Sequence, residues 1–236
     1  MNGASEERLA EIRSRIDKAA QLAGRKGEEV RLIAISKTYD ADAIRPLLEA
    51  GHRLFGENRV QEAQDKWPVL KADHPDAELH LVGRLQSNKA RSVAGYAHAV
   101  HSVDRESLVA PLSRGAVEGG RPVGVFVQVS LDGDPKRGGV VLDRLPALAG
   151  AVAAAEGLEL LGLMAVAPLG ADPDAAFAPL GDLSRGLQAD HPGAWRISAG
   201  MSGDLEAAVR AGATHLRVGS AVLGERPPLE YRPNGG

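Results

Sequence analysis

Short apolar segments alternate with amphipathic segments along almost the whole chain, and this alternation constrains the fold more than any other feature. Strand-length apolar runs separated by helical patterns are typical of a parallel sheet, because parallel neighbours must be joined by a crossover helix. The sequence predicts eight such strands, at residues 31–36, 52–55, 78–82, 97–102, 122–129, 158–165, 195–198 and 215–218.

Helical patterns fill the intervals between the predicted strands. Gly51 and Gly212 each follow a helical stretch, as expected for the left-handed residue that ends a helix. A further charged amphipathic helix is predicted at residues 4–24, ahead of the first strand. The amphipathic segments between the strands include residues 59–70, 88–94, 105–118, 143–156, 175–189 and 204–211.

Eight strand–helix repeats in 236 residues predict a single (β/α)8 barrel, the TIM-barrel fold of the α/β class, whose typical length is about 250 residues. A doubly wound open sheet is the alternative. Against it, the first strand runs into Lys37-Thr-Tyr-Asp, which lacks the glycine-rich turn of dinucleotide-binding sheets. No linker divides the chain, so we assign residues 1–226 to one barrel domain and residues 227–236 to a flexible C-terminal tail.

Composition and charge exclude several classes of function. Hydrophobic residues make up 44% of the chain and charged residues 25%, which is typical of a soluble globular protein. A net charge of -3 gives no reason to expect binding to nucleic acid or to an anionic membrane. The absence of cysteine excludes disulfides and zinc–thiolate sites, and the charged N-terminus does not resemble a signal peptide. We therefore expect a cytoplasmic protein.

Polar residues follow several of the predicted strands. In a (β/α)8 barrel the reactive groups lie at the carboxyl ends of the strands and in the loops after them. Lys37 follows the first strand, Asn58 the second, residues 198–202 the seventh, and residues 217–220 the eighth. We expect these residues to converge at one end of the barrel, although they are far apart in the sequence.

Lys37 ends the apolar run at residues 31–36 and is therefore expected to bring an amine to the end of a buried strand. Burying an ammonium alone is unfavourable, so a lysine in this position is either a Schiff-base nucleophile or a salt-bridge partner. An ion pair with a carboxylate such as Glu57 is the structural alternative. Taken by itself, the lysine does not distinguish the two interpretations.

Two glycine-containing segments near the C-terminus resemble anion-binding loops. Gly200 and Ser202 lead into one helical segment, and Gly219 and Ser220 lead into a short helical turn at residues 221–224. Glycine lets backbone N–H groups approach an anion, and the loops after strands 7 and 8 often bind phosphate in such barrels. Ordinary turns with serine caps are the alternative. A nucleophilic lysine and a phosphate site together suggest pyridoxal 5'-phosphate (PLP).

Histidines offer no metal site in the sequence. His80, His98 and His101 lie near predicted strands, but their spacing does not pair them as ligands. We interpret them as hydrogen-bonded core or loop histidines and expect no metal.

Seven segments in order along the chain resemble one known family, the YggS/PROSC-type pyridoxal phosphate homeostasis proteins, which are similar to the barrel domain of alanine racemase. The resemblance implies a fold-type III PLP-binding barrel. It covers nearly the whole chain and is highly specific for that reason. The matching segments are residues 35–38 (ISKT), 55–62 (FGENRVQE), 82–89 (VGRLQSNK), 101–105 (HSVDR), 161–164 (LGLM), 198–204 (SAGMSGD) and 217–224 (RVGSAVLG).

The resemblance also implies roles for individual residues. Lys37 matches the lysine that forms the Schiff base, and Arg217 matches the arginine that faces the pyridine nitrogen. Asn58 matches an asparagine near the cofactor ring, and Met201 matches a residue that lines the pocket. The segments matching the phosphate site contain Ser198, Gly200, Ser202, Gly219 and Ser220.

Members of this family bind PLP without established turnover and are thought to buffer or deliver it. The resemblance therefore implies a monomeric PLP carrier that contacts PLP-dependent apoenzymes transiently and is not an enzyme. An arginine at the pyridine nitrogen does not readily give up a proton, which weakens the ring as an electron sink. The alternatives are a weak fold-type III enzyme, such as an amino-acid racemase, and a barrel that binds another phosphorylated metabolite.

Two departures from the family pattern bear on these expectations. Some relatives carry a second lysine two positions after the first, where this chain has Tyr39, so this chain lacks any part that the second lysine plays in PLP release. Tyr39 is expected to pack on the rim of the site. The loop at residues 132–139 carries Arg137 in place of a small residue.

Overall fold

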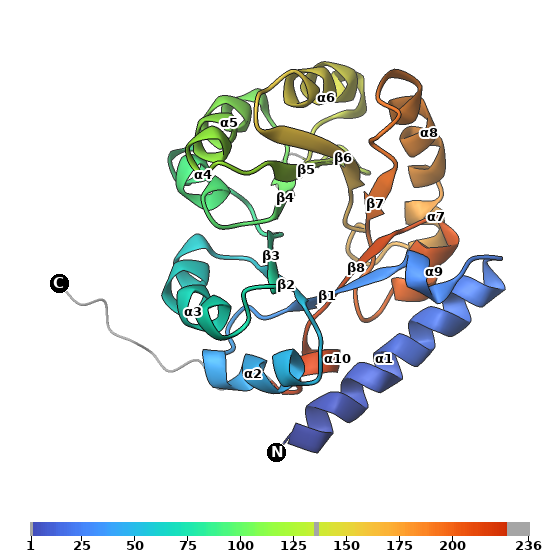
Figure 1. Cartoon of the computed structure of the whole chain (residues 1–236). Coiled ribbons are helices and arrows are strands. Elements are labelled where there is room, and N and C mark those ends of the chain that lie inside the picture. Colours follow the sequence, from blue (N-terminus) through green and yellow to red (C-terminus); the bar gives the residue numbers. More distant parts are fainter. Residues whose placement is uncertain (1, 135–136, 226–236) are drawn as a thin grey trace.

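The computed structural model describes residues 2–134 and 137–225, and it contains one closed barrel of eight parallel strands. The strands follow one another around the barrel in sequence order, and β8 closes it by pairing with β1 at four positions (Figure 1). The closed circuit confirms the predicted (β/α)8 fold and excludes the open doubly wound sheet. The strands are β1 (Arg31–Ile35), β2 (Leu54–Glu57), β3 (Glu78–Leu81), β4 (Ala99–Val103), β5 (Val123–Gln128), β6 (Leu158–Met164), β7 (Arg196–Ser198) and β8 (His215–Val218).

Helices surround the strands in an outer ring (Figure 1). All eight predicted strands are present, with ends that differ by at most two residues from those predicted. The helices are α1 (Asn2–Leu22), α2 (Ala41–Glu49), α3 (Val60–Asp73), α4 (Ser87–Ala94), α5 (Val109–Glu118), α6 (Leu145–Ala153), α7 (Pro173–Phe177), α8 (Leu180–Asp190), α9 (Leu205–Arg210) and α10 (Ser220–Leu223).

Two helical features add to the prediction or differ from it. The helix expected before Gly51 was predicted without a start, and the structure shows it as α2, where Asp40 caps the first turn by accepting a hydrogen bond from the Ala43 N–H at 2.9 Å. Ile44, Leu47 and Leu48 supply its buried face. The single segment expected at residues 175–189 is two helices, α7 and α8, and Pro179 precedes the second.

Strand parity decides which side chains enter the barrel. Alternate residues of a strand point to opposite faces, so Ile33, Ile35 and Lys37 share one face. Ile33 and Ile35 form an interior cluster that is separate from the main core between the strands and helices. Ile33 pairs with Arg217 on β8, which is also buried. The same face of β1 and β8 therefore directs Lys37 and Arg217 toward the barrel interior.

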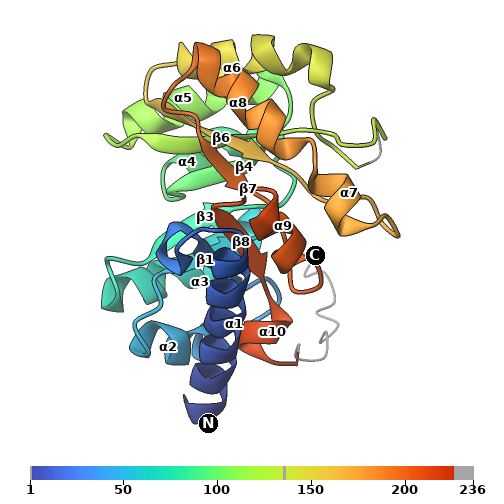
Figure 2. The same cartoon turned by 90° about the vertical axis from the view of Figure 1, so that its right-hand side faces the viewer.

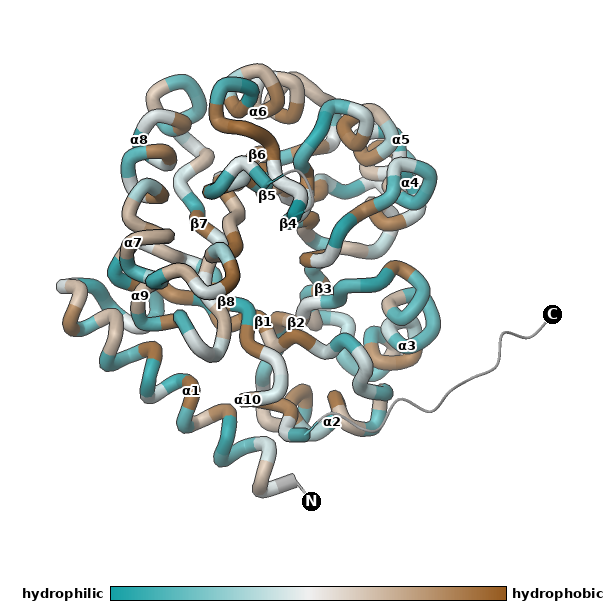
Figure 3. The backbone as a smooth tube through the Cα atoms, turned by 180° about the vertical axis from the view of Figure 1, so that it is seen from behind, coloured by the Kyte–Doolittle hydropathy of each residue, from teal (hydrophilic) through white to brown (hydrophobic). Residues whose placement is uncertain are grey.

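Helix α1 lies across the ends of the last two repeats, beside α9 and α10 (Figure 2). Leu9, Ile12 and Ile16 form its buried stripe, and hydrophobic and hydrophilic residues alternate along its length (Figure 3). The Arg8 Nε donates to the Val222 carbonyl at 3.0 Å, and the Arg15 Nη2 donates to the Ser202 carbonyl at 3.1 Å. Helix α1 thus holds the two loops that follow β7 and β8.

The remaining sequence expectations concern the chain end and the membrane. The tail predicted at residues 227–236 lies outside the described residues. No helix in the described part of the chain combines the length and the apolar character needed to cross a bilayer.

Candidate cofactor-binding site

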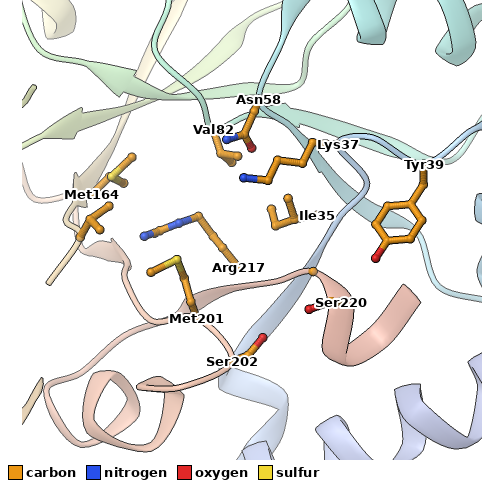
Figure 4. Close-up of a pocket in the computed structure, with 12 residues that line it drawn as sticks. Ile35, Lys37, Tyr39, Asn58, Val82, Met164, Met201, Ser202, Arg217 and Ser220 are labelled. Carbon is orange, nitrogen blue, oxygen red and sulfur yellow. The ribbon is translucent and has the colours of Figure 1, made fainter. Parts of the chain in front are cut away.

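A cavity of about 220 Å³ lies at the carboxyl ends of the strands, where the sequence places the candidate residues. Lys37 projects into it from the loop after β1 and Arg217 from the neighbouring strand β8, with Met164 and Val82 beside them (Figure 4). Among the residues that the structure describes, its lining contains these two cationic side chains and no carboxylate. The cavity is lined by Ile35, Lys37, Tyr39, Asn58, Val82, Met164, Val166, Met201, Ser202, Arg217, Gly219 and Ser220.

Lys37 is half-buried and makes no ion pair within residues 2–134 and 137–225. The alternative of a Lys37–Glu57 salt bridge is therefore wrong. Glu57 is paired with Lys66 of α3 instead, at 2.8 Å between Oε1 and Nζ. No sequence pattern indicated this partner, because Lys66 lies in the middle of a helix that was predicted only to cover the barrel.

Lys66 of α3 holds the loop that carries Lys37 in place. Besides the carboxylate of Glu57, the Lys66 ammonium binds the carbonyl oxygens of Ser36 at 2.7 Å and Tyr39 at 2.8 Å. The Ser36 hydroxyl donates to Glu57 Oε1 at 2.6 Å. Main-chain groups on both sides of Lys37 are thus bound by one buried ion pair, which limits where its amine can lie.

Thr38 has a positive φ of 72°, and it is the only non-glycine residue of the described chain in this conformation. The left-handed region is unfavourable for a β-branched residue and persists only where the surroundings enforce it. Here the Thr38 N–H donates to Glu62 Oε2 of α3 at 2.9 Å. The strained residue lies directly beside Lys37, as strained residues at functional sites often do.

Glu57 is fully buried, and burial raises the pKa of its carboxyl although Lys66 lowers it. Three donors reach its Oε1: the Ser36 hydroxyl, the Lys66 ammonium and the Trp67 indole N–H at 3.1 Å. Its Oε2 is buried and has no hydrogen-bond partner among the described residues. All three donors therefore stabilise the Glu57 carboxylate through the same oxygen, Oε1.

Arg217 is buried in the barrel, with 5% of its surface exposed. Its Nη1 donates to the Ser198 hydroxyl at 2.7 Å, and its Nη2 donates to the Ala165 carbonyl at 2.9 Å. Burial lowers the pKa of Arg217 to about 10, with Asp204 opposing the shift, so the guanidinium remains charged at neutral pH. No carboxylate lies within ion-pair distance of it in the described chain, which leaves its charge for a ligand.

The loops after β7 and β8 present hydrogen-bond donors to the cavity. The hydroxyls of Ser202 and Ser220 line it, and neither makes a hydrogen bond within the described residues (Figure 4). The backbone N–H groups of Ser202, Gly203 and Ser220 also donate no hydrogen bond within that part of the chain. These free donors match the needs of an anion with several acceptor oxygens.

The structure brings together seven of the nine residues predicted for the site: Lys37, Asn58, Met201, Ser202, Arg217, Gly219 and Ser220 all line the cavity.

The other two predicted residues do not line the cavity. Ser198 is fully buried behind it, where its hydroxyl accepts from Arg217. Gly200 has a φ of 91°, and an added Cβ would lie 2.5 Å from the Cβ of Ala208, so its absence of a side chain serves packing. That these two residues belong to a phosphate-binding segment stays a prediction.

Met164 lies at the end of the predicted strand 158–165, but the sequence did not predict the apolar lining by Ile35, Val82 and Val166. Strand parity at Ile35 is the one signal that could have found it. Tyr39 lines the cavity edge, and its hydroxyl donates to the Gly224 carbonyl at 2.6 Å, in agreement with the expected rim position.

His80 and His101 lie in the barrel interior and are hydrogen-bonded to each other at 2.8 Å. His98 is half-buried just before β4, where its Nδ1 accepts from the Leu79 N–H at 3.1 Å. Within the described ranges, no group of three or more metal-binding side chains is arranged to hold an ion.

The fold and the cavity define a class: a (β/α)8 barrel with a lysine after β1, a buried arginine on β8 and free donors in its last two loops. The family model described as alanine racemase, N-terminal domain, matches residues 8–227. The chain is 44% identical over 238 residues to the pyridoxal phosphate homeostasis protein of Mycobacterium tuberculosis (strain H37Rv), covering 92% of this chain and 91% of the relative. The chain belongs to the family of pyridoxal phosphate homeostasis proteins.

Solved structures agree with this assignment. PipY of Synechococcus elongatus with PLP bound has a TM-score of 0.79 and 38% identity, over 93% of this chain and all of that one. Alanine racemase from Corynebacterium glutamicum shares the fold alone, with a TM-score of 0.68 and 16% identity. The comparison covers 94% of this chain and 63% of the racemase.

Proposed function

We propose that the protein binds PLP in the Lys37–Arg217 cavity and holds it as a reversible Schiff base on Lys37. In this proposal the protein stores and releases the cofactor in the cytoplasm, as part of PLP (vitamin B6) homeostasis, without efficient catalytic turnover. Its partners are PLP itself and, transiently, PLP-dependent apoenzymes, and it acts as a monomer. The names of its relatives and the PLP bound in PipY support the choice of ligand.

The observation that carries the proposal is the combination of two cations, free donors and no carboxylate in one cavity. A dianionic phosphate and a ring nitrogen that accepts a hydrogen bond suit this lining. An uncompensated buried guanidinium is unfavourable until an acceptor or an anion reaches it, so the apo site favours such a ligand.

In this proposal, different residues of the cavity bind different parts of PLP. When bound, PLP supplies an aldehyde that condenses with a primary amine, releasing one water, and an electron-withdrawing ring. Lys37 offers the amine, and Arg217 offers N–H donors for the ring nitrogen. The hydroxyls and N–H groups of Ser202 and Ser220 are available to the phosphate, with Gly219 allowing close approach. Val82 and Met164 provide apolar contact for the ring.

The lining disfavours efficient catalysis. Arg217 has only donors and stays protonated, so it does not pass a proton to the ring nitrogen. Racemisation needs an acid or base on each face of the cofactor. Lys37 is one such group, but the Tyr39 hydroxyl is engaged with the Gly224 carbonyl. No histidine or carboxylate of residues 2–134 and 137–225 lines the cavity. A weak fold-type III activity, such as racemisation, is the second candidate, favoured by the shared racemase fold.

An absorbance titration with PLP tests the ligand and its anchor. We expect a visible band in the wild type that borohydride abolishes, with the cofactor then fixed covalently to the peptide containing Lys37. Lys37→Ala should lack both the band and the adduct. Lys89→Ala is the matched control, because this exposed lysine lies outside the cavity lining and should leave both unchanged. Without a band in the wild type, the barrel would instead bind another phosphorylated metabolite and leave Lys37 unmodified.

Deuterium exchange at the α-carbon of amino acids separates a carrier from a weak enzyme. A carrier exchanges the α-proton no faster than an equal concentration of free PLP. Exchange well above that rate, and lost in Lys37→Ala, would contradict the proposed absence of turnover and favour the second candidate.

A further inference from the structure

A line of polar side chains runs through the barrel interior below the cavity. Ser198 and His101 are both fully buried, and His80 is 3% exposed. Aromatic rings surround them: the Phe126 ring stacks on His101 with 4.2 Å between ring centroids, and His215 lies edge-on to Phe126 at 5.2 Å. Polar groups in such surroundings are stable only when they are hydrogen-bonded.

Short distances connect the line from one end to the other. Arg217 Nη1 lies 2.7 Å from Ser198 Oγ, and Ser198 Oγ lies 2.8 Å from His101 Nδ1. His101 Nε2 lies 2.8 Å from His80 Nδ1. The last step, from His80 Nε2 to Glu78 Oε2, is 3.8 Å, which is an electrostatic contact and not a hydrogen bond.

The carboxylate at the far end has its own partner. Glu78 begins β3 and forms an ion pair with Arg31, which begins β1, at 2.8 Å. The contact with His80 and the charge of Arg31 lower the pKa of Glu78 to about 2, although burial opposes this, so the group is an acceptor at neutral pH. Glu78 and Arg31 lie at the amino ends of their strands, opposite the cavity.

The two ends determine the direction of every hydrogen bond in the line. A guanidinium has donors only, so Ser198 Oγ accepts from Arg217, and its one hydrogen is available for His101 Nδ1. His101 then carries its proton on Nε2 and donates to His80 Nδ1. His80 in turn carries its proton on Nε2, facing the Glu78 carboxylate.

Hydrogen bonds running in the opposite direction, from His80 toward Ser198, would be unfavourable at both ends of the line. They would give Ser198 two donors and leave its own hydrogen unplaced in the core. They would also place the lone pair of His80 Nε2 against the negatively charged Glu78. Burial lowers the pKa of both histidines, and the charge of Arg217 adds to this effect at His101, in agreement with two neutral rings.

We propose that Ser198, His101 and His80 form a directed hydrogen-bonded column, with both histidines in the neutral Nε2–H form, that fixes the orientation of the Arg217 guanidinium toward the cofactor ring nitrogen. These three are positioning residues, because none of them lines the cavity. The part of this proposal that concerns the cofactor rests on the proposed function. The part that concerns the histidines does not.

The chemical nature of the column explains why Arg217 keeps its charge for the ligand. A carboxylate in place of Ser198 would also orient the guanidinium, but it would neutralise it and weaken its attraction for an anion. Neutral hydroxyl and imidazole groups orient the cation and leave its charge uncompensated. The carboxylate of the line, Glu78, is placed at the opposite end of the barrel.

Nitrogen-15 NMR of the histidine rings tests the column in the apo wild-type protein. For His80 and His101 we expect two well-separated ring shifts each, with the proton on Nε2, unchanged between pH 8 and pH 6. A proton on Nδ1 of either ring, or a doubly protonated ring in this range, would overturn the assignment. This outcome does not depend on PLP binding.

The serine link is tested by PLP titration of Ser198→Ala and Ser198→Thr. Loss of one hydrogen bond to a charged group should weaken PLP binding about tenfold in Ser198→Ala and shift the absorbance maximum of the bound cofactor. Ser198→Thr keeps the hydroxyl and should retain both. His215→Gln is the control, since His215 is equally buried but bonds to Thr214 outside the column, at 2.9 Å.

Equal affinity and equal absorbance in Ser198→Ala and Ser198→Thr would overturn the positioning role, as would the same loss in His215→Gln. Failure of the wild type to bind PLP would refute the proposed function instead, and the NMR result would still decide whether the column exists.

Discussion

Lys66 and Glu57 form a buried ion pair, 2.8 Å from Nζ to Oε1, whose ammonium also binds the carbonyl oxygens on both sides of Lys37. The side chain of Lys66 is 10% exposed and that of Glu57 is not exposed at all. Buried ion pairs contribute little net stability, because desolvation offsets most of the attraction, but losing one partner is strongly destabilising. The pair is therefore better understood as a fixed support for the Lys37 loop.

Lys66→Met should lower the free energy of unfolding by about 3–5 kcal/mol at neutral pH, because it leaves the Glu57 carboxylate buried without a cation. Urea unfolding measures this loss. The pKa of Glu57, already raised by burial, should rise further, so the variant should become more stable as the pH falls and its carboxyl takes up a proton. A variant without this pH dependence would argue against a charged Glu57 in the wild type.

Two further variants separate support from stability. Glu57→Leu combined with Lys66→Met should recover part of the lost stability but still bind PLP more weakly, because the Ser36 and Tyr39 carbonyls lose their donor. Arg45→Met breaks an ion pair with Asp73 that lies nearer the surface. It should change stability by less than about 1 kcal/mol.

Thr38→Gly should stabilise the apo protein by up to about 1 kcal/mol, because glycine adopts a positive φ without the strain of a β-branched residue. The same change loosens the segment beside Lys37, so PLP affinity should fall. Thermal unfolding of the apo protein and a PLP titration measure the two effects. A loss of stability in Thr38→Gly would show that the threonine side chain, and not the backbone strain, dominates at this position.

Gly200→Ala should destabilise the protein by about 1–3 kcal/mol, since the new Cβ would lie 2.5 Å from Ala208 Cβ and 2.8 Å from Leu216 Cδ2. Its positive φ adds strain. Gly203→Ala, three positions later in the same loop, is the matched control, because no atom lies within 4 Å of the added Cβ. Equal melting temperatures for the two variants would contradict the packing role of Gly200.

Stability should decrease as the pH falls below 6.5, the ordinary pKa of histidine. Burial lowers the pKa of His52 to about 4 and that of His215 to about 2. Between pH 6.5 and 4 the unfolded chain therefore binds more protons than the folded one. The free energy of unfolding falls there by up to about 1.4 kcal/mol per pH unit for each such histidine, and the contribution is fully present above pH 6.5.

Urea unfolding at pH 7.5, 6.0 and 5.0 measures this slope, in a range where carboxylates still contribute little. His52→Asn should make the slope shallower. His191→Asn, which removes a half-buried histidine after α8, is the comparison variant. A stability that does not change between pH 7.5 and 5.0 would contradict the neutral state of the interior histidines.

The sequence predicted the parts of this structure that depend on local pattern. Alternating apolar segments identify eight strands, and the rule that barrel sites lie at the carboxyl ends of strands is enough to place Lys37 and Arg217 together. The sequence indicated helix α2 only through Gly51, the glycine that follows it, and the Asp40 cap at its start is seen only in the structure. The two anion-binding loops were predicted from glycine and serine near helix starts.

Partners across the barrel could not be predicted. Ser198 meets His101 97 positions away in sequence, and Lys66 meets Ser36 30 positions away, through side chains whose neighbours only the closed fold determines. The sequence suggested Glu57 as a partner of Lys37, and nothing local to Lys66 marked it as the better partner. Roles that depend on hydrogen-bond direction, such as that of Ser198, follow only from atomic positions.

The contact of Arg8 with the Val222 carbonyl spans 214 positions of sequence. Helix α1 is synthesised before α10, whose surface it binds. A partly made chain can form its first strands and present the Lys37 amine, yet it lacks the arginine and the last donor loop. The complete cavity can therefore form only after translation has passed residue 223, because its last lining residues lie in β8 and α10.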